Sequence, residues 1–217
     1  MPDGPRGRTV HESTWITLYM TASSNLAQLP VTDRHVKPAQ IAHFVIYTSR
    51  FAEATAWYKA FLGASATFED EKLAFLTYDD EHHRVAIAYL PGLAQQPKQV
   101  ASIHHIAFTY GTLWELLVTW KRLAEQAILP YWTVNHGPTT SMYYADPDGN
   151  RIEFQVDNFA TADEAKAYCS LPEFQENSVG VEFDPEDLLL RLNAGESEAA
   201  LKKRPNIGPR SILTSRA

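Results

Sequence analysis

The chain has 217 residues, of which 45% are hydrophobic and 12% aromatic, and this apolar content excludes a wholly disordered protein. The formal net charge is −7 at pH 7, and an acidic chain without a Lys/Arg cluster is not expected to bind nucleic acid. The single cysteine, Cys169, excludes an internal disulfide and any site built from several cysteines. No segment approaches the roughly 20 apolar residues of a membrane span, so we expect a cytoplasmic protein with no membrane partner.

A strand followed by a helix opens the organised part of the chain. The segment 41–47 (IAHFVIY) predicts a buried strand, and Ser49 is expected to cap the helix after it. Gly63 should end this helix. Its apolar positions follow a 3.6-residue period, namely Phe51, Ala54, Trp57, Tyr58, Phe61 and Leu62. Three short strands are then predicted near 64–69, 72–78 and 83–90.

The same order of elements then repeats. The segment 102–109 (SIHHIAFT) predicts a strand, Gly111 and Thr112 open a second helix, and Pro130 is expected to end it. Strands are predicted near 131–135, 140–145 and 150–157. His43 and His105 occupy matching positions in the two halves, and so do the segments 84–87 (RVAI) and 151–154 (RIEF). Each half is therefore a βαβββ module.

A single module cannot bury both faces of its sheet under one helix. We therefore predict an α+β fold in which modules 38–92 and 101–158 form a curled mixed sheet around a shared metal cavity, within one domain at 38–158. In that arrangement His43 and His105 face each other across an approximate twofold axis.

Both ends of the chain differ from this repeat. Residues 1–37 are rich in Pro, Ser and Thr, and we interpret them as an N-terminal arm. Residues 159–217 are interpreted as a helical C-terminal extension, with helices expected at 161–169 and 183–192.

His43, His105 and Glu153 are the candidate metal ligands. Two imidazoles in apolar strands cost free energy unless each finds a partner, and a shared metal would satisfy both. Glu153 lies among Ile152, Phe154 and Val156, where an unpaired carboxylate would be expensive. Two histidines and one carboxylate with open positions are the ligand set of mononuclear non-haem Fe(II) sites. Mn(II) has the same ligand preference here, and zinc also accepts two His and a Glu.

The repeat places Ala86 where a fourth ligand could have stood opposite Glu153. The site is therefore predicted to have three protein ligands and several open positions. Such a site suits the binding of a bidentate catecholate together with O₂.

At this point the residues resemble the vicinal oxygen chelate superfamily, and specifically its type I extradiol ring-cleavage dioxygenases. The resemblance runs from about residue 41 to 158 and covers one two-module domain. Its segments are IAHFVIYT, EHHRVAI, IHHIAFT, NHG and SMYYADPDGNRIEFQVD. DPDGNRIE marks the superfamily broadly, and the other features carry the extradiol character.

The resemblance implies a role for each candidate site residue. His43, His105 and Glu153 match the iron ligands, with His104 ranked second to His105 because strand alternation points it to the opposite face. His83 matches an acid/base histidine, while His82 is expected at the surface. Tyr143 matches a substrate-binding tyrosine, although Tyr144 competes for the role. His136 resembles a histidine that binds substrate, but its spacing to Tyr143 is about two residues shorter than in some relatives.

The implied reaction is extradiol cleavage of a small aromatic diol with O₂, in a protein that is expected to form a homo-oligomer. Aromatic residues such as Phe75, Tyr89 and Trp132 are candidates to line a slot for the ring, or else to pack in the core. Two other functions stay open from the sequence. One is a glyoxalase- or epimerase-like lyase or isomerase, which the absent fourth ligand disfavours. The other is a non-catalytic protein that binds small aromatics, which the full ligand triad disfavours.

Overall fold

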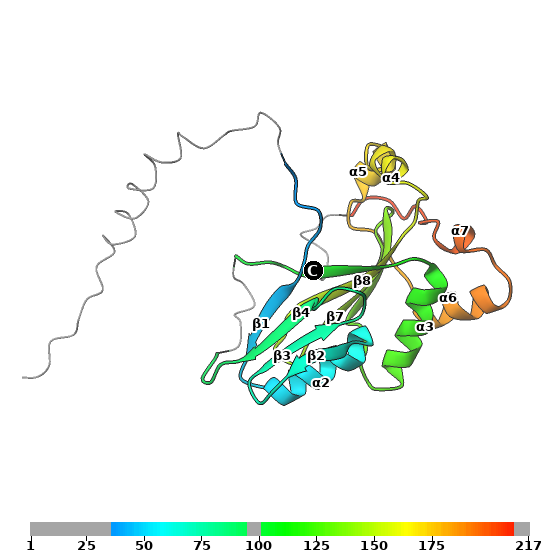
Figure 1. Cartoon of the computed structure of the whole chain (residues 1–217). Helices are drawn as coiled ribbons and strands as arrows, with labels where there is room; N and C mark the ends of the chain where they lie inside the picture. Colours follow the sequence, from blue (N-terminus) through cyan, green and yellow to red (C-terminus); the bar gives the residue numbers. More distant parts are fainter. Residues whose placement is uncertain (1–35, 95–100, 211–217) are drawn as a thin grey trace, which may run out of the picture. The chain divides into compact units, whose positions relative to one another are not determined.

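The computed structural model describes residues 36–94 and 101–210 (Figure 1). The chain divides into two units, residues 1–41 and residues 42–217. Most of the predicted N-terminal arm lies outside the described residues. The domain limits proposed from the sequence, at 37/38 and 158/159, stay predictions.

The first module has the predicted order of elements. It contains β1 (Phe44–Thr48), α2 (Phe51–Leu62), β2 (Ser65–Glu69), β3 (Leu73–Thr77) and β4 (Val85–Tyr89). The strand order is β1-β4-β3-β2, with β1 parallel to β4 and the other pairs antiparallel; we call it sheet A. Gly63 ends α2 in the left-handed conformation, as predicted. Ser49 is not the cap, because the N-cap is Arg50 and makes no side-chain capping bond.

The second module repeats this topology. It contains β5 (Ile106–Tyr110), α3 (Leu113–Ala124), β6 (Trp132–Asn135), β7 (Thr139–Ala145) and β8 (Arg151–Asp157). Thr112 caps α3 through a capping box with Glu115, as the sequence indicated. The helix ends at Ala124, well before Pro130, and the chain then turns at Ala127, whose φ is 60°.

The C-terminal extension contributes four helices and a strand among the described residues. These are α4 (Ala162–Cys169), α5 (Pro172–Glu176), β9 (Val181–Glu182), α6 (Pro185–Asn193) and α7 (Glu198–Leu201). The sequence did not predict β9, which pairs antiparallel with β6 and completes sheet B in the order β5-β8-β7-β6-β9. The helix expected at 183–192 begins at Pro185, because the Asp184 side chain caps it. α6 packs against α3 (Figure 1).

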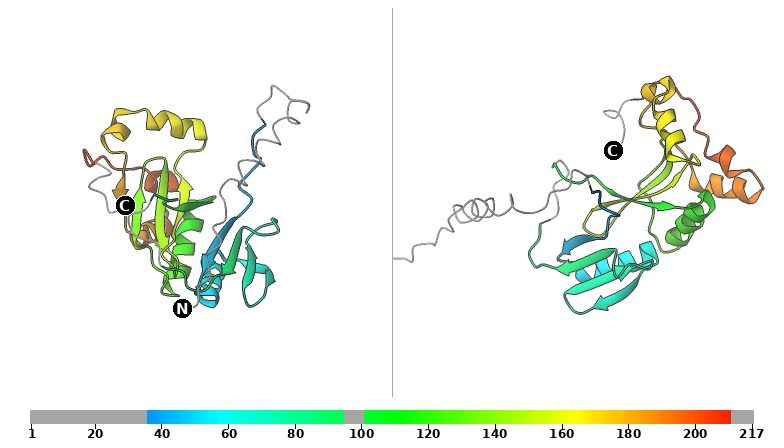
Figure 2. Two further views of the ribbon diagram at one scale, coloured as in Figure 1. Left: turned by 90° about the vertical axis from the view of Figure 1, so that its left-hand side faces the viewer. Right: turned by 45° about the horizontal axis from the view of Figure 1, so that its top comes forward.

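The two modules pack against each other through the faces of their sheets that contact α2 and α3. Phe61 of α2 stacks on Phe154 of β8 with ring centroids 4.1 Å apart, and Phe44 of β1 lies 6.1 Å from Phe108 of β5. Arg122 of α3 donates a hydrogen bond to the carbonyl of Phe61 at 3.1 Å. Phe61 and Phe154 belong to one hydrophobic core, against which Phe44 and Phe108 pack. Figure 2 shows the two sheets in separate layers.

The opposite side of each sheet lies away from this core. In β1, Ile46 and Thr48 are buried, whereas Val45 is 51% and Tyr47 64% exposed. The sequence predicted 41–47 as a buried strand, and β1 is instead buried on one side only. We call the side of sheet A that carries Val45 and Tyr47 the A face, and the side of sheet B that carries Glu153 the B face.

The α+β class and the duplicated βαβββ modules are confirmed. The described strands form two mixed sheets of four and five strands and no closed barrel. The expected curl around a shared cavity is replaced by an aromatic core between the modules. No helix among the described residues is long and apolar enough to cross a membrane.

Candidate functional site

Glu153 and His105 form a close pair on the B face. Glu153 lies in the middle of β8 and is only 4% exposed. Its Oε2 atom is 2.9 Å from Nε2 of His105, which directly precedes β5. The parallel pairing of Ala107 with Glu153 holds the two elements in this register. The buried carboxylate thus has an imidazole partner, as burial of a charge requires.

Tyr143 extends this pair across the sheet. It lies opposite Glu153 in the β7–β8 ladder, and its hydroxyl is 2.9 Å from Nε2 of His136. Burial and the neighbouring Glu153 carboxylate raise the pKa of Tyr143, so this residue is a neutral phenol at physiological pH. Trp132 stacks on the Tyr143 ring with centroids 5.0 Å apart. The alternative residue, Tyr144, is 1% exposed in the core, where it packs against Phe154.

The C-terminal extension sets the orientation of His136. The Nδ1 atom of His136 is hydrogen-bonded to the carbonyl of Val179, which belongs to this extension. A carbonyl can only accept, so Nδ1 must carry the proton, and Nε2 of the neutral ring is left as an acceptor toward Tyr143. Burial lowers the pKa of His136, which favours this neutral form. Arg204 donates to the carbonyls of His136 at 3.2 Å and of Asn177 at 2.6 Å, and so ties the extension to the site.

His43 and His83 form a second group on sheet A. Their ring centroids are 4.2 Å apart, and His83 stacks on Phe75 of β3 at 4.6 Å. Burial lowers the pKa of His83, and the neighbouring imidazoles of His43 and His82 act in the same direction. His82 is exposed, as expected, and its Nδ1 accepts a hydrogen bond from the His83 amide at 2.9 Å.

His104 makes contacts that differ from those of His105. Its Nδ1 is 2.8 Å from Nδ1 of His105, and its Nε2 accepts from Arg151. His105, and not His104, therefore contacts the Glu153 carboxylate.

The two groups do not form one cluster within the chain. Over residues 36–94 and 101–210, no three His, Cys, Asp or Glu side chains converge closely enough to hold a metal ion. The structure brings His105, Glu153, Tyr143 and His136 together on one sheet, and His43 and His83 together on the other. The donor chemistry of two imidazoles and a carboxylate fits Fe(II), but the third donor, His43, is separated from the other two.

Because the two modules are repeats, equivalent residues of the two sheets form corresponding rows of cross-strand partners. Val45, Ala86, Phe75 and Phe68 are consecutive cross-strand partners across sheet A. Ala107, Glu153, Tyr143 and Trp132 are the corresponding partners across sheet B. The apolar row thus has Ala86 and Phe75 where the polar row has Glu153 and Tyr143. Ala86 is 3% exposed and occupies the position that corresponds to Glu153 in the second module.

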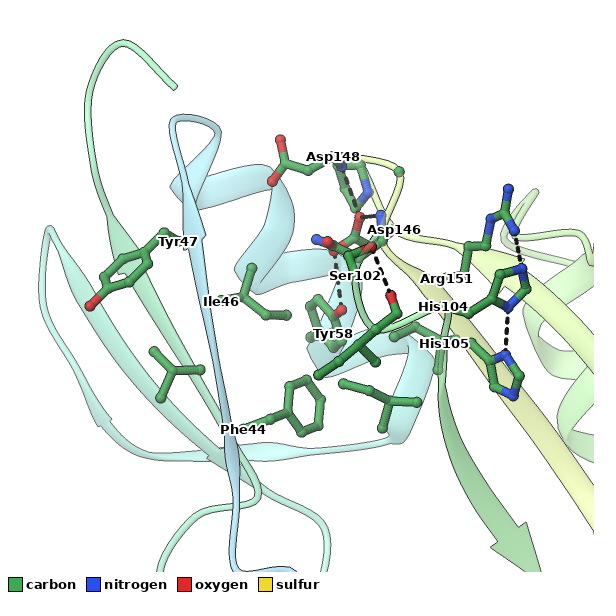
Figure 3. A pocket seen from close by; sticks show the side chains of 17 residues that line it. Phe44, Ile46, Tyr47, Tyr58, Ser102, His104, His105, Asp146, Asp148 and Arg151 are labelled. Carbon is green, nitrogen blue, oxygen red and sulfur yellow. Dashed lines mark hydrogen bonds between the residues drawn. The ribbon is translucent and has the colours of Figure 1, made fainter. Parts of the chain in front are cut away.

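A cleft lies between β1, the segment that precedes β5 and the β7–β8 turn. It has a volume of about 860 Å³ and is lined by Phe44, Tyr58, His104, His105, Asp146 and Ile152, among others (Figure 3). Glu153, Tyr143 and His136 do not line this cleft, so it borders the candidate chemistry at His105 only.

The turn motif DPDG stabilises the wall of this cleft. Asp146 is buried and accepts hydrogen bonds from the backbone amides of Asp148 and Asn150 at 2.9 and 2.8 Å. The Tyr58 hydroxyl donates to the same carboxylate at 3.1 Å. The motif therefore links the β7–β8 turn to α2, and its role is structural.

Sequence reasoning missed Val179 and Arg204. Both act at His136 through backbone carbonyls, and hydrogen bonding of that kind leaves no pattern in the sequence.

Comparison with known proteins places this geometry in a family. Residues 40–154 match the model of the Glyoxalase/Bleomycin resistance protein/Dioxygenase superfamily. "Biphenyl-2,3-diol 1,2-dioxygenase 2" of Rhodococcus globerulus is 46% identical over 158 residues, covering 72% of this chain and 83% of that protein. "Biphenyl-2,3-diol 1,2-dioxygenase 3" of the same organism is 40% identical over 167 residues, covering 76% and 88%.

Solved structures are more distant. The lactoylglutathione lyase of Agrobacterium tumefaciens is 18% identical, covers 55% of this chain and 94% of its own, and has a TM-score of 0.44. The family match spans both modules, and the two dioxygenases align over most of their length. The chain belongs to the glyoxalase, bleomycin resistance protein and dioxygenase superfamily.

Proposed function

We propose that this chain is an extradiol dioxygenase, which cleaves the ring of a catechol-type aromatic beside its two hydroxyl groups with O₂. The observation that carries the proposal is the linked set of side chains on the B face, from His105 through Glu153 and Tyr143 to His136. The names of two relatives at 46% and 40% identity support the same reaction.

The metal ligands in this proposal are His43, His105 and Glu153, of which His105 and Glu153 are in contact while His43 lies on the other sheet of the chain. Fe(II) is the proposed metal, and Mn(II) has the same preference for these donors. When bound, the cation would lower the pKa of the catechol hydroxyls and supply open positions for substrate and O₂.

Tyr143 and His136 are proposed to handle protons on the substrate side. Because the pKa of Tyr143 is raised, the phenol acts as a hydrogen-bond donor and not as a phenolate base. The Nε2 atom of His136, 2.9 Å from the Tyr143 hydroxyl, is an unprotonated acceptor. A proton released by a catechol hydroxyl can therefore pass through the Tyr143 oxygen to His136.

His83 is proposed as the acid/base group on the other side of the substrate. Its lowered pKa keeps it neutral near pH 7, and a neutral imidazole can both accept and donate a proton. The stack of His83 on Phe75 fixes the plane of the imidazole. Phe75 and Trp132 are the proposed walls of a slot for the aromatic ring.

The oxygen electrode gives the direct test. Protein prepared without oxygen and loaded with Fe(II) should consume O₂ when given catechol or 2,3-dihydroxybiphenyl, and should form a yellow ring-opened product. His43→Ala and Glu153→Gln should abolish both signals. Full turnover by His43→Ala, or tight zinc binding without oxygen uptake, would contradict the proposal.

A further inference from the structure

Trp132 lies on the B face beside the two residues that are proposed to handle protons. Its indole stacks on the Tyr143 ring, with centroids 5.0 Å apart and planes inclined by 25°. The His136 ring lies nearly perpendicular to the indole, with centroids 5.5 Å apart. Trp132 and Tyr143 are cross-strand partners in β6 and β7. The sheet therefore fixes their backbones, whereas side-chain contacts must select the rotamer of the indole.

A carboxylate of the C-terminal extension holds the indole in this orientation. Glu182 of β9 accepts a hydrogen bond from Nε1 of Trp132 at 3.1 Å. Because β9 pairs with β6 so that Glu182 lies opposite Val134, Glu182 and Trp132 are diagonal neighbours on the same side of sheet B. Nε1–H is the only polar group of the indole, so this bond uses its whole hydrogen-bonding capacity.

Arg210 in turn holds the Glu182 carboxylate. The guanidinium of Arg210 donates to both carboxylate oxygens, one of them at 2.6 Å, and this bidentate pairing fixes the plane of the carboxylate. Arg210 also donates to the carbonyl of Gly180 at 3.0 Å. The hydrogen bonds from Arg210 and Trp132 lower the pKa of Glu182 to about 2, so the acceptor of the indole bond is ionised at physiological pH. A chain of contacts thus runs from Arg210 through Glu182 to Trp132.

These contacts set a position and contribute little to the stability of the fold. The side chains of Glu182 and Arg210 are 46% and 18% exposed, and ion pairs at the surface add little to the free energy of unfolding. Neither residue packs against the hydrophobic core of the described residues, and nor does Trp132. A variant of Glu182 is therefore expected to fold, so that its effect on Trp132 can be measured by itself.

We propose that Glu182, held by Arg210, is a positioning residue that fixes the Trp132 indole as a wall for the part of an aromatic substrate beyond its diol ring. The inference rests on the proposed function, in which the diol lies at Glu153 and Tyr143. Glu153, Tyr143 and Trp132 occupy successive strands of one row, and strands lie roughly 4.8 Å apart. A diol ring held between the first two leaves Trp132 to contact what that ring carries. The indole is partly exposed, and its flat apolar surface favours a second aromatic ring.

The indole N–H signal tests the positioning without using the reaction. The chain has five tryptophans, and in a ¹⁵N–¹H NMR spectrum of metal-free protein the Trp132 signal is the one that Trp132→Phe removes. We expect Glu182→Ala to move this signal upfield in the proton dimension, because the bond to a carboxylate is lost. Glu182→Gln, whose amide oxygen still accepts, should move it less. Glu196→Ala is the matched control, because Glu196 pairs with Arg191 in the same bidentate way elsewhere in the extension, and it should leave the signal in place.

Oxygen-uptake kinetics of the Fe(II)-loaded enzyme test the wall. Glu182→Ala should raise KM for 2,3-dihydroxybiphenyl by about tenfold, the scale of a lost apolar contact in a pocket. KM for catechol, which has no second ring, should change by less than about twofold, and kcat should stay near the wild-type value for both diols, because the lost contact acts on binding. Adding Glu182→Ala to Trp132→Phe should raise KM no further, since phenylalanine cannot donate to the carboxylate.

The outcomes separate this inference from the proposed function. If the wild type cleaves both diols but the Trp132 signal stays in place in Glu182→Ala, or KM rises equally for the two diols, the positioning role is wrong and the function stands. If the signal moves as expected but the wild type consumes no O₂ with either diol, the function is wrong and the hold of Glu182 on Trp132 stands.

Discussion

The Nε2 atom of His136 lies 2.9 Å from the hydroxyl of Tyr143 on the B face. On the other side of the same imidazole, Nδ1 is held by the carbonyl of Val179. The relationship fixes which nitrogen of His136 can take a proton.

Tyr143→Phe should remove the proton path between substrate and His136. We expect kcat/KM for catechol to fall by about 100-fold, the lower range for loss of a proton-transferring group. Tyr144→Phe is the matched control, because the Tyr144 hydroxyl donates to the Met142 sulfur at 3.6 Å and the residue is buried in the core. Oxygen-uptake kinetics on both variants check this, and equal losses in the two would contradict the role of Tyr143.

Arg204→Ala should loosen His136 without touching the substrate. Its guanidinium bonds the carbonyls of His136, Asn177 and Glu173, so its loss should free the imidazole to populate the other tautomer. Long-range ¹⁵N–¹H NMR of the metal-free protein measures the tautomer directly, and we expect the Nδ1-protonated form to dominate in the wild type only. Arg204→Lys should keep part of the preference for the Nδ1-protonated tautomer that Arg204→Ala loses.

The control for this variant is Arg191→Ala. Arg191 lies on the surface of α6 and pairs with Asp187 and Glu196. This variant should leave the tautomer of His136 unchanged, and a wild-type spectrum for Arg204→Ala would show that Arg204 does not position the ring.

The stability of the metal-free protein should depend on pH through His136. Burial lowers the pKa of His136 in the folded state, whereas the unfolded value is about 6.5. As the pH falls below about 6.5, the unfolded chain takes up a proton at this histidine before the folded chain does. The contribution of His136 to the free energy of unfolding is therefore complete above about pH 6.5 and is lost as the pH falls toward the folded pKa. Urea unfolding across this range should show a flatter profile for His136→Gln. An identical slope in both proteins would exclude this histidine as the source.

Glu198 of α7 should stabilise the start of α3. Its carboxylate accepts hydrogen bonds from the amides of Leu113 and Trp114, both at 3.0 Å, and negative charge at a helix N-terminus is favourable. Glu198→Ala should lower the free energy of unfolding by about 1 kcal/mol. Glu186→Ala, in the first turn of α6, keeps the α3 contact and serves as control in the same urea titrations. A loss no larger than in the control would exclude this anchoring role.

The sequence by itself determined each module and the chemistry that it carries. Gly63 ended α2, Thr112 and Glu115 began α3, and strand alternation put Glu153 and Tyr143 on one side of sheet B. These features depend on contacts between residues that are close in the chain or on neighbouring strands, which local pattern encodes.

Only the tertiary structure decided how the modules meet. The contact between Phe61 and Phe154 joins residues far apart in the sequence, and either side of a sheet could in principle have formed the shared core. The hold of Val179 and Arg204 on His136 is likewise made through backbone carbonyls. The acceptors in these contacts are backbone carbonyls, which every residue carries, so the sequence does not indicate which carbonyl His136 or Arg204 will meet.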